Sequence, residues 1–168
     1  MITPSYCALM ARYNAWQNSQ LVTALDPVPA EDVVADRGAF FGSILGTLNH
    51  ILWADQIWMS RFDERFAKPD GGIPESPRLC PDFSAWRDER ASMDARMAEW
   101  AAGLSHEDLA GDVAWYSGAA ERDVVKPRAF CISHMFNHQT HHRGQVHTMM
   151  TSAGFTGNTS DLFLIPEI

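Results

Sequence analysis

The chain has 168 residues, of which 46% are hydrophobic, so it is long and apolar enough for one substantial core and is neither disordered nor fibrous. Its 13 basic and 21 acidic residues give a net charge of −8, which argues against a surface for nucleic acid or anionic membrane. The N-terminus lacks the basic start and apolar stretch of a signal peptide, and no run of about 18 apolar residues predicts a membrane span. Three widely spaced cysteines without a CxxC pair favour a reduced, cytoplasmic protein.

The first predicted element is a helix over residues 4–25. Thr3 is a suitable N-cap and Pro4 suits the first helical position, whereas Asp26-Pro27 ends the helix. Apolar side chains recur in it at helical rather than alternating spacing. The following residues 26–37, which include two prolines, are predicted to form a turn and a loop.

Two further helices are predicted in the middle of the chain. The first covers residues 38–66 and is strongly apolar, and a loop rich in proline and glycine follows it over residues 68–77. The other covers residues 83–102, with Asp82 as its N-cap and Gly103 at its end.

The last third of the chain predicts a short hairpin, a long helix and an apolar tail. Over residues 112–125 the pattern changes to that of a short β-hairpin with Ser117-Gly118 in its turn. The fourth helix covers residues 127–154, and the tail 155–168 is apolar enough to dock back on the helices or on a partner chain. We therefore expect an all-α fold, a four-helix bundle with a short β-hairpin between helices 3 and 4, in a single domain over residues 1–168.

The fourth predicted helix carries five of the seven histidines within fourteen residues: His134, His138, His141, His142 and His147. His138 and His142 are four residues apart, so their Cβ atoms share a helix face about 6 Å apart, a spacing that one divalent metal can bridge. On the helical wheel His142 lies within the apolar arc and His138 at its edge, whereas the other three lean out of it. The pair His138/His142 is thus favoured as metal ligands over an exposed histidine stripe or hydrogen-bonded core imidazoles.

A sixth histidine, His50, lies on a stripe of the second predicted helix with Thr47, Ala54 and Ile57. A single histidine there is more commonly a hydrogen-bonded core residue. Burying an imidazole without a partner costs a few kcal/mol, and a metal would be such a partner. Together with the pair on the fourth helix, His50 completes a candidate three-histidine site with an open position.

Several other kinds of site are excluded or disfavoured. No Glu-x-x-His motif points to a di-iron bundle, and His106-Glu107 lacks the second histidine of a zincin motif. There is no CxxCH, no glycine-rich phosphate loop and no GxSxG. We interpret the cysteines as structural, and most of the six tryptophans as core with one or two in a pocket. Asp55 and Arg143 are polar residues on apolar wheels, and we favour salt bridges at helix exits over a role beside the metal or substrate.

At these residues the chain resembles the DinB/YfiT-like metalloenzyme superfamily, over essentially its whole length. The matching segments are Tyr13-Asn14-Ala15-Trp16, Leu48-Asn49-His50-Ile51-Leu52, Asn137-His138-Gln139-Thr140-His141-His142-Arg143-Gly144-Gln145 and Ser160-Asp161-Leu162. The resemblance implies a four-helix bundle, often dimeric, with a divalent metal on three histidines that correspond to His50, His138 and His142. Characterised relatives include thiol-dependent S-transferases and a maleylpyruvate isomerase.

Two hypotheses about function follow. The first is a metal-dependent enzyme that acts on a small-molecule substrate, in which Zn²⁺, Ni²⁺ or Fe²⁺ on three imidazoles activates a low-molecular-weight thiol for S-transfer, or water for hydrolysis. The lack of an obvious general base favours the thiol. The second is a non-catalytic, stress-related dimeric bundle with a structural metal, which a fourth ligand from His134 or His141 would support. In both cases we expect a homodimer and neither nucleic acid nor membrane as a partner.

Overall fold

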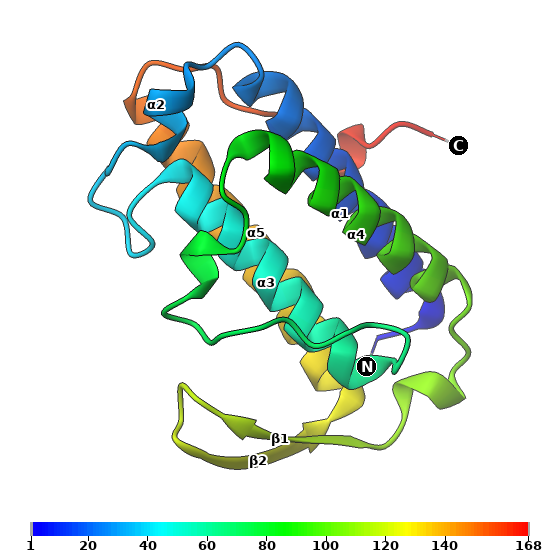
Figure 1. Ribbon diagram of the computed structural model, residues 1–168. Coiled ribbons are helices and arrows are strands. Elements are labelled where there is room, and N and C mark those ends of the chain that lie inside the picture. Colours follow the sequence, from blue (N-terminus) through cyan, green and yellow to red (C-terminus); the bar gives the residue numbers. More distant parts are fainter. Residues whose placement is uncertain (1, 168) are drawn as a thin grey trace.

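Four long helices form the body of the protein, whose computed structural model describes residues 2–167 (Figure 1). They are α1 (Pro4–Leu25), α3 (Ile44–Phe62), α4 (Phe83–Ala102) and α5 (Arg128–Ser152). α1 packs mainly on α4 and α3 mainly on α5, while α3 also contacts α4 and so connects the two pairs. The predicted four-helix bundle is confirmed. No helix within residues 2–167 combines the length and apolarity needed to cross a membrane.

The first and third predicted helices have the bounds that their capping residues indicate. The Tyr6 backbone N–H donates to Thr3 Oγ1 over 3.1 Å at the start of α1. At the start of α4, the Ala85 backbone N–H donates to Asp82 Oδ1 over 2.8 Å. A side-chain oxygen thus satisfies one of the free N–H groups at each helix start, which fixes the first residue of the helix.

The second predicted helix was too long at both ends. α3 begins only at Ile44, because Gly42 has a φ of +78° that no regular helix allows and Ser43 caps the next turn by accepting from the Gly46 N–H. It ends at Phe62, so residues 63–66 lie outside it. The predicted loop before it contains a short helix that the sequence did not reveal, α2 (Ala30–Val34), which follows Pro29.

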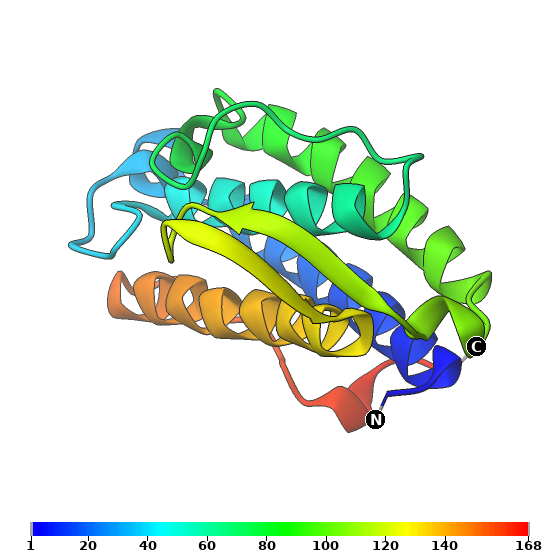
Figure 2. The same ribbon diagram turned by 90° about the horizontal axis from the view of Figure 1, so that it is seen from below.

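The predicted hairpin is confirmed, with β1 (Asp112–Ser117) antiparallel to β2 (Arg122–Pro127). Trp115 stands opposite Val124 in its register, and the turn comprises residues 118–121, so Ser117 pairs with Arg122 at the end of the strand and, of the two predicted turn residues, only Gly118 lies in the turn. Seen from below, the hairpin lies across the α3–α5 side of the bundle (Figure 2). It therefore covers the helix pair that carries the histidines.

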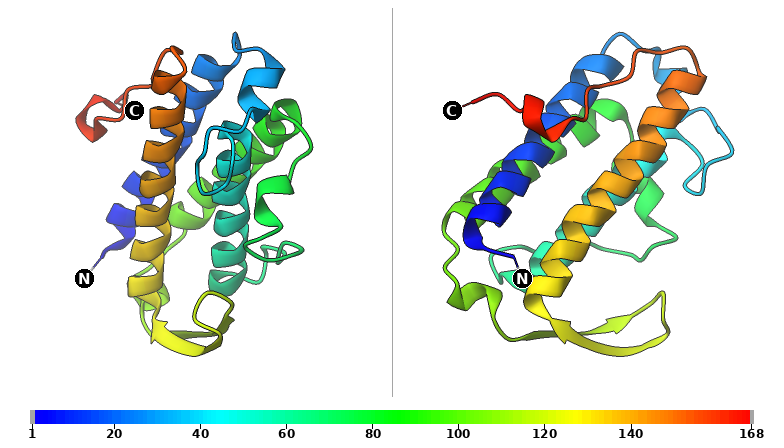
Figure 3. Two further views of the ribbon diagram at one scale, coloured as in Figure 1. Left: turned by 90° about the vertical axis from the view of Figure 1, so that its left-hand side faces the viewer. Right: turned by 180° about the vertical axis from the view of Figure 1, so that it is seen from behind.

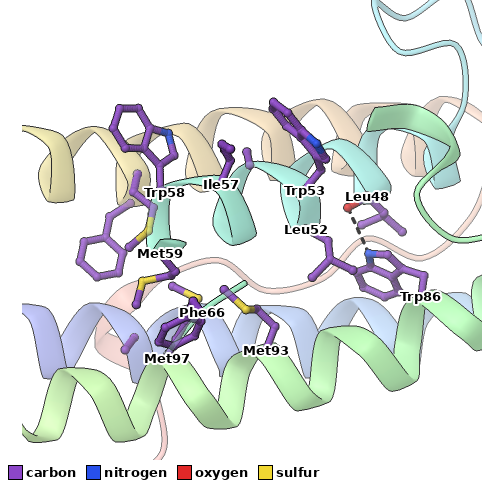
Figure 4. Close-up of a cluster of buried hydrophobic side chains, with 14 of the residues drawn as sticks. Leu48, Leu52, Trp53, Ile57, Trp58, Met59, Phe66, Trp86, Met93 and Met97 are labelled. Atoms are coloured by element: carbon purple, nitrogen blue, oxygen red, sulfur yellow. Dashed lines mark hydrogen bonds between the residues drawn. The ribbon is translucent and has the colours of Figure 1, made fainter. Parts of the chain in front are cut away.

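α3 buries two faces that have different neighbours. On one face, Leu48, Leu52 and Met59 lie toward α4, and the Trp86 indole N–H donates to the Leu48 carbonyl oxygen over 3.1 Å (Figure 4). Trp53, Ile57 and Trp58 point away from α4 in the same view. The first face belongs to the core of the bundle, which leaves the second face for the α5 and hairpin side.

The tail after α5 returns along α1, as Figure 3 shows from behind. Tyr13 OH donates to the Ser160 carbonyl oxygen over 2.6 Å, and Gln17 Nε2 donates to that of Thr159 over 2.7 Å. The expectation that the tail docks on the bundle thus holds for this part. The apolar segment η3 (Leu162–Leu164) stays exposed, with Phe163 at 82%, and Ile168 lies outside the described residues.

Candidate metal centre

The structure brings together the three histidines that the sequence singles out. His50 on α3 and His138 and His142 on α5 each offer a ring nitrogen, and these nitrogens all lie within 4.8 Å of one another. The Nε2 atoms of His50 and His138 are 3.1 Å apart. Across residues 2–167 this set includes neither His134 nor His141. The triad has therefore no fourth histidine ligand in the structure.

The tautomer of His50 is fixed by Ser76, a residue that sequence reasoning missed. Ser76 Oγ lies 2.8 Å from His50 Nδ1, and its hydroxyl donates to the Ile73 carbonyl oxygen over 2.7 Å. Because the single hydroxyl hydrogen is used there, Ser76 accepts the proton of His50 Nδ1. His50 Nε2 is left with its lone pair directed toward the other two histidines.

His142 is oriented in the same way from its own helix. Its Nδ1 lies 2.7 Å from Oε1 of Gln145, one turn further along α5. An amide oxygen only accepts hydrogen bonds, so Nδ1 carries the proton and Nε2 is free as a ligand. Supporting partners of this kind are typical of metal-binding histidines.

The three imidazoles are neutral at physiological pH. Burial, reinforced by the neighbouring imidazoles, lowers the pKa of His50 to about 4 and that of His138 to about 3. Burial also lowers the pKa of His142. Neutral imidazole is the form that binds a metal, so protons compete little at neutral pH.

Phe41 holds the ring of His50 from the turn that precedes α3. The two ring centroids are 3.8 Å apart and nearly parallel. The turn approaches α3 so closely that a Cβ atom at Gly46 would collide with the Phe41 carbonyl oxygen. Phe41 lies outside α3, whereas the predicted helix over residues 38–66 included it, so this contact was not predicted.

The donor set fits a divalent metal such as zinc. Two nitrogens that share a tetrahedral zinc at 2.0–2.1 Å stand about 3.3 Å apart, close to the 3.1 Å between His50 and His138. The longer separations within the set reach at most 4.8 Å, so a bound ion would have to draw these nitrogens closer together. The triad can therefore hold a metal ion with three protein nitrogens.

The triad lies in the wall of a cavity of about 830 Å³ between α3, α5 and the hairpin. The wall is largely aromatic, with Phe40, Phe41, Trp53, Trp58, Trp115, Tyr116 and Phe130. Three tryptophans line it, whereas one or two were predicted from the sequence. A volume of this size accommodates a small organic molecule next to the histidines.

Asp55 and Arg143 are not salt bridges at helix exits, which corrects the interpretation favoured above. Asp55 is 1% exposed, forms an ion pair with Arg90 of α4 and accepts from Gln139 Nε2 over 2.7 Å. Arg143 donates to Asn14 Oδ1 inside the bundle. Neither residue lines the cavity, and both make their polar contacts inside the bundle.

Cys7, Cys80 and Cys131 are all buried and free, consistent with structural roles. Burial raises the pKa of Cys7 and of Cys80 to about 11, and it also raises that of Cys131. Cys131 contributes to the cavity wall, but its thiol is protonated at neutral pH.

Comparison with known proteins gives one consistent family. The sequence profile of the DinB family matches residues 1–167. Protein DinB of Bacillus subtilis (strain 168) is 21% identical over 150 residues, which span 89% of this chain and 87% of that protein. The crystal structure of a DinB-like protein from Bacillus cereus resembles the fold with a TM-score of 0.62 and 19% identity, and the match covers 93% of this chain and 91% of that one.

Proposed function

The chain belongs to the DinB family, and from this premise we propose that it is a divalent-metal-dependent enzyme of the S-transferase type whose metal ligands are His50, His138 and His142. The observation that carries the proposal is the convergence of three neutral imidazoles in the wall of a large cavity, rather than inside a closed core. A catalytic metal site keeps a position open, whereas a structural site has four protein ligands.

The chain's residues prepare the site before any ligand arrives. Ser76 and Gln145 hold two of the rings with Nε2 free, and Phe41 prevents His50 from tilting away. The aromatic wall gives the cavity beside the histidines a largely apolar lining. When bound, a divalent metal supplies a Lewis acid that lowers the pKa of a thiol, so that thiolate is available at neutral pH.

The cavity favours a thiol over water as the nucleophile. None of its lining residues within 2–167 is an aspartate or glutamate, so a hydrolase would have to use His134 or His141 as its general base, whereas a thiol with a pKa lowered by a metal needs no base at neutral pH. In the proposed transfer, the sulfur of a small thiol forms a bond to an electrophilic carbon. The thiol proton goes to solvent, and the leaving group departs with its bonding electron pair.

The first test is metal content, measured by inductively coupled plasma mass spectrometry on tag-free protein. We expect about one metal per chain in the wild type and none in His142→Ala. His147→Ala is the matched control, because His147 lies on the same helix and contacts Asn158 instead of the triad. Equal metal content in all three proteins would refute the site.

The second test is transfer itself. Zinc-loaded wild type should accelerate the reaction of a small thiol with an activated aryl chloride, and His138→Ala should reduce the rate to background. A protein that binds zinc at the triad yet accelerates no thiol in a panel of cysteine, glutathione and coenzyme A would contradict the transferase proposal, while leaving the metal site intact.

We also propose that two copies associate, as the resemblance to dimeric relatives implies. The exposed apolar segment Leu162–Leu164 supports this, because large apolar side chains in solvent favour association. Sedimentation velocity at micromolar concentration should show a dimer, and Phe163→Ser should weaken it. A monomeric wild type would rule the association out.

A further inference from the structure

The cavity beside the triad has the opposite charge to the chain as a whole. The chain carries 21 acidic and 13 basic residues, yet the cavity is lined by Arg61, Lys68 and Lys126 and, within residues 2–167, by no acidic side chain. In such an acidic protein, an accidental cavity of this size would be expected to include carboxylates. The charge distribution thus disfavours a cationic occupant and favours an anionic one.

Arg61 is the cation that lies deepest in this cavity. Its guanidinium carbon is 4.5 Å from the ring centroid of Trp58 and 5.1 Å from that of Trp115. The residue is half-buried, whereas Lys68 and Lys126 are exposed. Two indoles from different elements, α3 and β1, therefore hold this arginine in one orientation by cation–π contact.

Arg61 has no anionic partner among residues 2–167. Its side chain forms neither a salt bridge nor a hydrogen bond with the groups that the structure describes there. The buried Arg90 is different, because Asp55 and Asp94 both pair with it. Burial lowers the pKa of Arg61, but an arginine stays protonated in proteins. Its donors are thus held in place, accessible from the cavity and free for a ligand.

The position of Arg61 sets the length of that ligand. Arg61 follows His50 by eleven residues on α3, which corresponds to about 16 Å along the helix axis. The arginine side chain leans back toward Trp58, which shortens this span. A molecule that reaches from Arg61 to the triad must still be extended, and the aromatic wall between them favours a planar or apolar body.

We propose that the cavity binds an extended organic anion with an aromatic or apolar body, its carboxylate on Arg61 and its reacting end toward the three histidines. The assignment of the reacting end rests on the proposed function, but the binding of the anion by Arg61 does not. The Arg61 guanidinium can donate two parallel N–H hydrogen bonds to a carboxylate. The exposed Lys68 and Lys126 attract the anion to the mouth of the cavity by their charge.

The test compares a naphthalene carboxylate with the neutral naphthalene carboxamide of the same shape. Binding is followed by calorimetry and by quenching of tryptophan fluorescence, on metal-free and on zinc-loaded protein. We expect metal-free wild type to prefer the carboxylate by about tenfold or more, because a hydrogen bond to a charged group is stronger than one to a neutral group. Arg61→Gln should lose this preference and keep its affinity for the carboxamide.

Two further variants keep the test decisive. Arg65→Gln removes the same charge four residues later, from an arginine that pairs with Asp63 and does not line the cavity, so the preference should remain. Arg61→Lys keeps the charge without the planar fork, so an intermediate preference is expected and folding is preserved if Arg61→Gln proves unstable. Circular dichroism checks the fold of each variant.

Each outcome separates the two proposals. Equal binding of both probes, or an unchanged preference in Arg61→Gln, would overturn the role of Arg61. A preference that occurs only in zinc-loaded protein and disappears in His138→Ala would make the metal the anion site and would overturn it as well. Absence of zinc binding would refute the proposed function but leave the preference of the metal-free protein as a direct measure of this inference.

Discussion

At the scale of single residues, the orientation of His50 depends on one hydroxyl group. Ser76→Ala removes the acceptor of the Nδ1 proton while leaving all three candidate ligands in place. The ring can then rotate or change tautomer, so we expect zinc affinity to fall about 10–100-fold with unchanged helical content. Competition with a chromophoric chelator measures the affinity.

Ser60→Ala is the control for this change, because the Ser60 hydroxyl donates to the Ile57 carbonyl oxygen on α3 and touches no histidine. Its zinc affinity should equal that of the wild type. If Ser76→Ala also retained the affinity of the wild type, the triad would not need the support of its loop, and the assignment of the His50 tautomer would lose its basis.

The cysteines give a second prediction at this scale. Since burial raises the pKa of Cys7 and Cys80 from 9.0 to about 11, the thiolate fraction at pH 8 falls by about a hundredfold. Native protein should therefore resist iodoacetamide at pH 8, whereas urea-unfolded protein should react readily. Mass spectrometry after a timed quench measures the modification. Rapid alkylation of the native chain would indicate that one of its own cysteines can act as a nucleophile. Resistance would indicate that the reacting thiol is supplied by a ligand.

At the scale of elements, capping signals predict helix bounds better than apolar runs do. Thr3 and Asp82 fixed the starts of α1 and α4 from local chemistry alone. The apolar stretch over residues 38–43 continued the pattern of α3, but the positive φ of Gly42 and the Ser43 cap separate it from the helix. The apolar run alone cannot reveal the break, because apolar residues in a turn and apolar residues in a helix have the same composition, and only the structure shows that residues 38–43 are exposed or half-buried.

The candidate site could be predicted only as far as it depends on signals within a single element. The i, i+4 spacing and the wheel identify His138 and His142, because both depend on one helix. Ser76 and Trp115 reach the site from a loop and from the hairpin, and no local pattern encodes that approach. Arg61 carried no signal in the sequence, since its significance lies in the lack of an acidic partner in three dimensions.

The buried ion pair between α3 and α4 yields the prediction at this scale. Arg90→Leu leaves Asp55 charged in the core without its cation, so we expect the free energy of unfolding to fall by about 3–5 kcal/mol. Urea denaturation measures the loss. Arg87→Leu, on the same helix but exposed and 3.5 Å from Asp26, should cost less than about 1 kcal/mol.

A double variant tests the cause of that loss. If the unpaired Asp55 carboxylate is responsible, Asp55→Leu combined with Arg90→Leu should be more stable than Arg90→Leu alone, because the fully buried carboxylate is then gone. Asp94, the other partner of Arg90, is 12% exposed and keeps its hydrogen bonds from Asn18. A double variant that is less stable than the single one would assign the loss to packing of the long arginine side chain instead.

At the scale of the whole molecule, the face of α3 that packs on α4 and the face that lines the cavity lie on different sides of the helix. The apolar face of α3 packs against α4, whereas Trp53, Ile57 and Trp58 face the cavity (Figure 4). The helices are therefore held by apolar burial and by the polar network around Asp55, independently of the triad. We therefore expect that a ligand can enter the cavity without disturbing the packing between α3 and α4.

This arrangement predicts that the protein folds without metal. After treatment with EDTA we expect unchanged far-ultraviolet circular dichroism and one cooperative melt, as for a single domain. Zinc at a hundredfold excess over its dissociation constant adds about 2.7 kcal/mol, which raises the melting temperature by about 5–10 °C for a chain of this size. The zinc-dependent rise should disappear in His138→Ala and persist in His147→Ala. Complete unfolding by the chelator would instead make the metal structural, because a structural site supplies the folding free energy itself.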